Sequence, residues 1–207
     1  MSQSQQEILL CAAHFIMQGY SWQEAREKTT REFSLKNRFP DSSDLERCLR
    51  NELYFLEPDH AAILKSWREL ALIQMQRINT PLYLTGAVLN GCATVHSDLR
   101  LAAFSDNPKD IEVALMQAGI DYEVVDEQTH KPQPSIAYGW LVPVPRGGLF
   151  RQKNPYLQAV AVCLEVFSLK DQGRLKGSLG EDPHQNDWER RAYLSQSNLI
   201  ALLKEIQ

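Results

Sequence analysis

The chain changes its hydrophobic periodicity once, at Asn79–Pro81, and this change limits the folds that are open to it. Before it, apolar residues recur every three to four positions, which is the spacing of one face of a helix. After it, short runs of β-branched and aromatic residues are separated by turn signals and by single helical segments. A chain of 207 residues built in this way predicts an α+β or α/β protein.

Four helices are predicted before the change, and together they form an N-terminal helical subdomain over residues 1–78. Two of them begin with a capping box, a serine followed three positions later by a glutamate: Ser21 with Glu24, and Ser43 with Glu46. The fourth is predicted to carry Pro58 in its first turn, where a missing backbone N–H costs nothing. We expect these helices to cap the rest of the chain, residues 79–207, and to pack with it as one unit.

The second part predicts a mixed sheet of four or five strands with flanking helices. One helix begins at Asn107 and Pro108 and ends at Gly119, and another closes the chain from residue 191 onward. Residues 146–153 are predicted as a basic loop, and residues 171–187 as a second loop. The predicted strands lie within residues 81–88, 97–104, 121–127, 135–145 and 158–169, the last with a helix as the less favoured alternative.

Composition excludes several classes of function. The net charge is −4 and the pI about 5.8, so no overall field attracts nucleic acid, and a nucleic-acid partner is not expected. No segment approaches the run of about 20 apolar residues that spans a bilayer. The first residues lack the basic start and apolar core of a secretory signal, so we expect no membrane association and a cytoplasmic location.

Cysteine and histidine spacing gives no sign of a disulfide framework or a zinc site. The four cysteines are far apart and form no C-x-x-C pair, and the five histidines form no His-x-x-x-His pair. Three cysteines lie inside apolar patterns, where a free cysteine behaves as a small buried hydrophobe. Of the histidines, only His96 lies in a segment with other candidate site residues.

That segment, Leu84–Phe104, carries the most informative spacing in the chain. A predicted strand runs into Gly86, a second glycine follows at Gly91, and Ser97 and Asp98 open the next strand. This arrangement resembles the active-site loop of the nucleotidyltransferase superfamily, in its branch of small, minimal nucleotidyltransferases. In that family a strand ends in Gly-Ser, a short helix follows through a glycine, and a Ser-Asp-x-Asp segment opens the next strand.

The resemblance implies a site for a nucleoside triphosphate. In the family, two aspartates at positions i and i+2 of a strand point to one side and hold two magnesium ions, and a third carboxylate on a neighbouring strand completes the set. Asp98 is then the metal ligand and the first catalytic residue, with Mg²⁺ as the implied cofactor. The phosphate-binding residues implied by the loop are Gly86, Ala87, Gly91 and Ser97, mainly through backbone N–H groups.

Two positions depart from the family pattern. Ala87 stands where the phosphate-binding serine is expected, and Arg100 stands where the second metal-binding aspartate is expected. Arg100 replaces a negative charge by a positive one, and its guanidinium could instead grip a phosphate directly. Catalytic residues that could replace the missing acid are His96, two positions before Asp98 on the expected strand, and a carboxylate of Asp121 or Glu123, with Glu123 the candidate carried forward.

The whole layout also resembles a group of uncharacterised bacterial proteins of similar length, some of which are labelled UDP-N-acetylmuramate–alanine ligase. That label disagrees with the residues. Such ligases use ATP through a glycine-rich loop that ends in Gly-Lys-Ser/Thr, and residues 173–178 do not have that spacing. They are also multidomain enzymes, for which 207 residues are too few.

The sequence thus leads to two hypotheses from different classes. The first is a nucleotidyltransferase-like protein that binds a nucleotide or phosphorylated small molecule at the Gly86–Asp98 loop, with its catalytic residues partly lost. The second is a non-catalytic interaction or regulatory protein on the same fold, whose N-terminal helices bind a protein partner or a second copy. In either, Ser97 and Asp98 could also be plain turn residues that bond local backbone.

Overall fold

The computed structural model describes residues 3–35, 39–126, 132–175, 177 and 184–205. Within them the protein is a mixed α/β structure, as the change of periodicity predicts. The helices are α1 (Gln3–Met17), α2 (Trp22–Glu32), α3 (Ser42–Leu56), α4 (His60–Arg77), α5 (Gly86–Asn90), α6 (Pro108–Gln117), α7 (Leu149–Lys153) and α8 (Gln196–Glu205). The strands are β1 (Tyr83–Thr85), β2 (Leu99–Phe104), β3 (Glu123–Val125), β4 (Ile136–Pro143), β5 (Ala159–Phe167) and β6 (Leu194–Ser195).

All described strands belong to one open sheet with the order β3-β4-β5-β2-β1-β6. Strands β2 and β5 are parallel, and every other neighbouring pair is antiparallel. The sheet therefore has six strands, where the sequence predicted four or five. The additional strand, β6, has only two residues and directly precedes α8, so the helical pattern of the closing segment conceals it.

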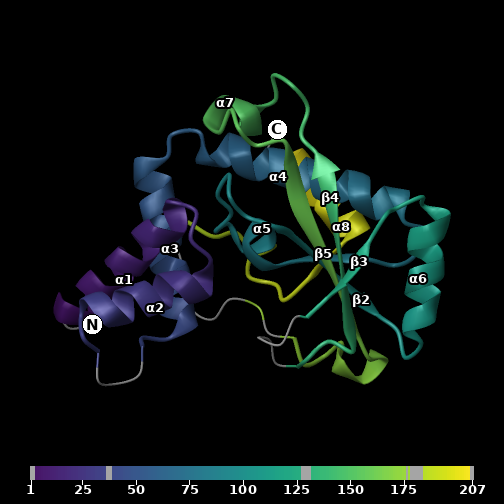
Figure 1. Ribbon diagram of the computed structural model, residues 1–207, viewed down its shortest axis with the longest axis horizontal. Helices are drawn as coiled ribbons and strands as arrows, with labels where there is room; N and C mark the ends of the chain where they lie inside the picture. The colour runs from purple at the N-terminus through teal and green to yellow at the C-terminus, as the bar shows by residue number, and fades with distance from the viewer. Residues whose placement is uncertain (1–2, 36–38, 127–131, 176, 178–183, 206–207) are drawn as a thin grey trace.

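The helices fall into two groups (Figure 1). Figure 1 shows α1, α2 and α3 gathered on the left, and the sheet with α6 beside it on the right. The larger hydrophobic core joins α4, α6 and α8 to one face of the sheet, through residues such as Trp67, Leu101 and Leu202. A second core lies among α1, α2 and α3 and includes Cys92. Helix α4 thus packs with the sheet, while the predicted domain boundary at residue 78 stays a prediction.

Local signals for helix ends are confirmed in part. The Ser21–Glu24 capping box is present, and α6 begins with Pro108 after Asn107, as predicted. The box predicted at Ser43 and Glu46 is wrong, because α3 begins two residues earlier, with Asp41 rather than Ser43 at its N-cap. Pro58 lies before α4 rather than in its first turn, since the N-cap residue is Asp59.

No helix in the described part of the chain is long and apolar enough to cross a membrane. The predicted loop over residues 171–187 lies partly outside the described residues, at 176 and 178–183.

Candidate functional site

Three charged side chains meet where β2 begins. Asp98 directly precedes β2, Arg100 is the second residue of β2, and Glu165 lies on the parallel neighbour β5. The Nε of Arg100 lies 3.0 Å from Oδ2 of Asp98, and its Nη1 lies 3.5 Å from Oε1 of Glu165. We call these three residues the Arg100 cluster.

Strand geometry explains why these residues meet. Arg100 lies beside Cys163 in the parallel register of β2 and β5, and Glu165 lies two residues farther along β5. Residues two apart on a strand point to the same face, so Cys163, Glu165 and Arg100 share one face of the sheet. It is the face opposite the larger core, because Leu101 and Leu164 alternate with them and are fully buried in that core.

The backbone at Gly86 allows the side chain of Arg100 to pack closely against it. Gly86, the first residue of α5, has a φ of +67°, in the left-handed region that favours glycine. A Cβ at Gly86 would lie 3.3 Å from Cδ of Arg100, so the arginine packs directly over the glycine. Thr85 is the register partner of Arg100, and its Oγ1 is buried with no hydrogen-bond partner among the described residues. The side chains of Thr85 and Arg100 therefore share one face of the sheet on neighbouring strands.

The opposite end of α5 is held by side chains from distant parts of the chain. Arg68 of α4 donates to the carbonyls of Val88 (3.2 Å) and Leu89 (3.1 Å). Further donors reach the last carbonyls of the same turn: Arg50 to Asn90 at 2.8 Å, Gln185 to Asn90 at 3.4 Å, and His60 to Gly91 at 3.0 Å. They satisfy the carbonyl groups that every helix leaves without an intrahelical partner at its C-terminus.

A buried ion pair completes this arrangement. Nη2 of Arg68 lies 2.6 Å from Oε1 of Glu189, with side-chain exposures of 2% and 8%. Oε2 of Glu189 also accepts a hydrogen bond from the backbone N–H of Asn186. We call Arg50, His60, Arg68, Gln185 and Glu189 the α5 anchor. The anchor fixes α5 from its C-terminal end and thereby fixes Gly86 beside Arg100.

The structure uses Gly91 and Ser97 differently from the implied phosphate-binding roles. Gly91 ends α5 in a left-handed conformation, with a φ of +84°, and its N–H donates to the carbonyl of Ala87. That N–H is not available to a phosphate. The hydroxyl of Ser97 accepts a hydrogen bond from the backbone N–H of Thr94 at 2.9 Å, so Ser97 stabilises the turn before β2.

His96 and Glu123 do not join Asp98. His96 is exposed in the turn before β2, so the prediction that it shares a strand face with Asp98 is wrong. Its ring packs at the turn between α1 and α2, 3.1 Å from where a Cβ of Gly19 would lie. Glu123 lies on β3, three strands from β2, and so about 14 Å away at the usual spacing of strands. Asp121 precedes β3 at the same edge.

Glu165 is the carboxylate that the sequence analysis missed. It is the only charged residue in the apolar run from Gln158 to Leu169. A single acid inside a buried strand calls for a partner, and that signal was available from the sequence. The identity of its partner could not be predicted from the sequence, because it depends on the pairing of β5 with β2.

The Arg100 cluster does not fit a magnesium site. The guanidinium of Arg100 lies between the two carboxylates that an ion would have to bridge. Among the described residues, no group of three His, Cys, Asp or Glu side chains could hold a metal ion. The positive charge between Asp98 and Glu165 is that of the Arg100 guanidinium.

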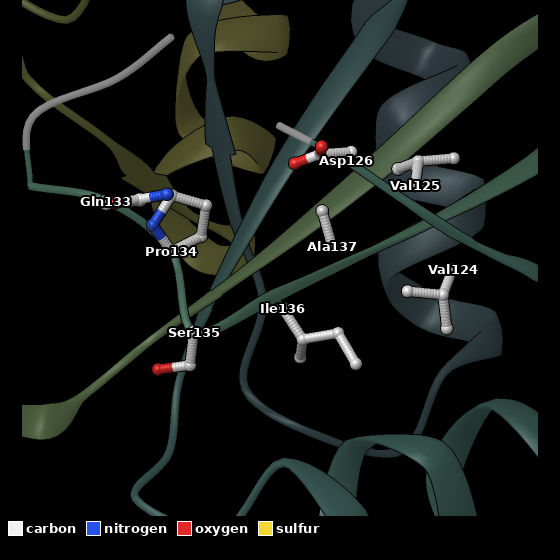
Figure 2. A pocket seen from close by; sticks show the side chains of 8 residues that line it. All are labelled: Val124, Val125, Asp126, Gln133, Pro134, Ser135, Ile136 and Ala137. Atoms are coloured by element: carbon white, nitrogen blue, oxygen red, sulfur yellow. The ribbon is translucent and has the colours of Figure 1, made fainter. Parts of the chain in front are cut away.

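A pocket of about 440 Å³ lies elsewhere, at the edge of the sheet formed by β3 and β4. Figure 2 shows its lining, which comes from the end of β3, residues 133–135 and the start of β4. None of the residues predicted as a site lines this pocket.

The α5 anchor contains a histidine, His60, whose protonation the fold disfavours. Burial lowers the pKa of His60, although its hydrogen bond to the carbonyl of Gly91 partly offsets this effect. Arg68 lowers that pKa further, while Glu189 and Glu57 raise it. The folded protein thus binds a proton at His60 less readily than the unfolded chain does.

We therefore expect His60 to contribute stability above its unfolded pKa of about 6.5, and this contribution to be lost as the pH falls through that value toward the lower folded pKa. His60→Gln keeps a donor for the Gly91 carbonyl and removes the titration. Urea unfolding at several pH values should show a smaller acid loss for this variant than for the wild type. The control is His14→Gln, because His14 is a half-exposed histidine that pairs with Glu52 outside the α5 anchor. An acid loss equal to that of the wild type would contradict the assignment.

Neither family models nor curated proteins match this chain. The Arg100 cluster and the α5 anchor are therefore the basis on which a function is proposed.

Proposed function

We propose that this protein is a nucleotidyltransferase-like protein that binds a nucleotide or another phosphorylated small molecule at Arg100, without metal-dependent transfer chemistry. The observation that carries the proposal is the position of Arg100. It replaces the second metal-binding aspartate of the family pattern, packs over Gly86 and lies between Asp98 and Glu165.

The local chain order supports the relationship. Strand β1 runs into the short helix α5, which ends at Gly91, and Asp98 then directly precedes β2. This is the strand, short helix and strand order that the resemblance implies. The carboxylate of Glu165 on the neighbouring strand β5 also supports the relationship, since the family pattern has its third acid on a neighbouring strand.

Charge argues against transfer chemistry. Nucleotidyl transfer needs a metal to neutralise the triphosphate, and a Mg²⁺ ion would be repelled by a guanidinium at the position where it must bind. An arginine can instead bind phosphate oxygens directly, through two parallel N–H groups.

Titration calorimetry with the four ribonucleoside triphosphates tests the proposal, each in EDTA and with Mg²⁺ or Mn²⁺. We expect binding in EDTA that is at least about tenfold weaker in Arg100→Leu, because charged hydrogen bonds contribute about 1.5–3 kcal/mol. The matched control is Arg47→Leu, which removes an arginine paired with an aspartate, Asp44, on the remote helix α3. Binding that requires metal would contradict the proposal, and so would binding that Arg100→Leu leaves intact.

One surface favours the alternative, a non-catalytic interaction protein. Tyr54, Phe55 and Leu56 end α3 with exposed fractions of 60%, 72% and 55%. Contiguous exposed apolar residues are typical of interaction surfaces. Absence of nucleotide binding, together with an association state that depends on protein concentration, would favour this alternative.

A further inference from the structure

We propose that Asp98 is an internal competitor for Arg100: its carboxylate pairs with the guanidinium in the free protein, and a bound phosphate displaces it. This inference rests on the proposed function, since it concerns how the same site opens. It assigns different roles to the two carboxylates of the Arg100 cluster. Asp98 is the exchangeable partner, and Glu165 is the fixed one.

The two carboxylates differ in burial: Asp98, the exchangeable partner, is the more exposed, and Glu165, the fixed partner, is buried. The side chain of Asp98 is 42% exposed and lies outside the strand, whereas that of Glu165 is 7% exposed and lies within β5. A displaced Asp98 carboxylate turns into water and is hydrated there. A displaced Glu165 carboxylate would lose a compensating charge while it remains buried, which is far less favourable.

The two carboxylates also contact different nitrogens of the Arg100 guanidinium. Asp98 bonds Nε, which lies on the side edge of the guanidinium, where Nε and one Nη present two parallel N–H groups. That edge suits the bidentate binding of a phosphate or carboxylate. Glu165 contacts Nη1 at the longer distance of 3.5 Å, from within the sheet. A phosphate that takes the side edge therefore replaces Asp98 and leaves Glu165 in place to orient the arginine.

The ion pair between Asp98 and Arg100 is only partly buried, with side-chain exposures of 42% and 24%. Partly exposed ion pairs are weak, so a phosphate can replace the Asp98 carboxylate.

The experiment compares pyrophosphate and ATP binding, in EDTA, for the wild type, Asp98→Asn and Glu165→Gln. We expect Asp98→Asn to bind pyrophosphate roughly five- to tenfold more tightly than the wild type, because the charged hydrogen bond that a ligand must break is gone. Glu165→Gln should not bind more tightly. Asp44→Asn, which neutralises an aspartate paired with Arg47 on α3, should bind as the wild type does and controls for net charge. ATP beside pyrophosphate shows whether the nucleoside adds affinity.

A second readout reports the exchange directly. The Nε–H resonance of Arg100 should move when pyrophosphate binds to the wild type and should differ already in free Asp98→Asn. Unchanged or weaker binding by Asp98→Asn, alongside wild-type binding that depends on Arg100, overturns the competitor role and leaves the proposed function standing. Tighter binding by Glu165→Gln also overturns it. Failure of both the wild type and Asp98→Asn to bind overturns both proposals.

Discussion

Glu189→Ala is expected to lower the free energy of unfolding by about 3–5 kcal/mol, the usual result of removing one partner of a buried ion pair. Arg68 would keep its hydrogen bonds to the carbonyls of Val88 and Leu89, but its charge would lose the carboxylate 2.6 Å away. Burial already lowers the pKa of Arg68, and Glu189 offsets that effect. The backbone N–H of Asn186 would lose its acceptor as well.

The same segment offers a matched control. Asp187 lies two residues before Glu189 and pairs with Arg190 at 3.7 Å, but its side chain is 97% exposed. Asp187→Ala should change stability by about 0.5 kcal/mol or less, as is typical of exposed pairs. Urea unfolding followed by circular dichroism measures both variants. Equal losses for the two would mean that the α5 anchor does not hold the fold together in the way we describe.

Interactions within a few residues of one another were predictable from the sequence. The Ser21–Glu24 box and the Asn107–Pro108 start of α6 depend only on residues next to the helix end, and both are confirmed. The Ser43–Glu46 box has the same pattern but is not used, because α3 starts earlier, with Asp41 at its N-cap. A local pattern therefore permits a helix start without fixing its residue.

Interactions between distant segments were not predictable in this way. Arg68 and Glu189 are separated by 121 positions, and no local sequence pattern in either segment predicts that they form an ion pair. Arg100 meets Glu165 because β2 and β5 are parallel neighbours, whereas the sequence predicts the third acid on β3. Helix α7 was predicted as part of a basic loop, because the glycines at 147 and 148 obscured the short helical turn after them.

The loop of the candidate site, Gly86–Asp98, was predictable in part. The spacing of Gly86, Gly91 and Asp98 correctly located a strand, a glycine-ended turn and a second strand. It did not reveal that Gly91 uses its N–H within α5, nor that Arg100 has two carboxylate partners. Spacing predicts the path of the backbone, and the chemistry follows from what the neighbouring strand supplies.

Arg100→Asp tests whether the cluster keeps the geometry of a metal site beneath the arginine. The substitution would bring three carboxylates together, those of residues 98, 100 and 165, and would remove the guanidinium that pairs with two of them. In EDTA we expect a loss of about 2–4 kcal/mol, limited because one carboxyl of such a group takes up a proton instead of remaining charged. The loss should grow as the pH rises, because like charges raise the pKa of that carboxyl.

Mn²⁺ or Mg²⁺ should then stabilise Arg100→Asp, since carboxylate oxygens are the ligands that both ions prefer. An ion present at 100 times its dissociation constant adds about 2.7 kcal/mol, so thermal unfolding with and without metal measures the effect. Arg100→Ala leaves only two carboxylates and should gain clearly less, and the wild type should gain nothing. Equal gains for the two variants would show that Asp98 and Glu165 are not placed to share an ion. Arg100 would then be an ordinary ion-pair residue, and the proposed relationship to nucleotidyltransferases would lose its chemical support.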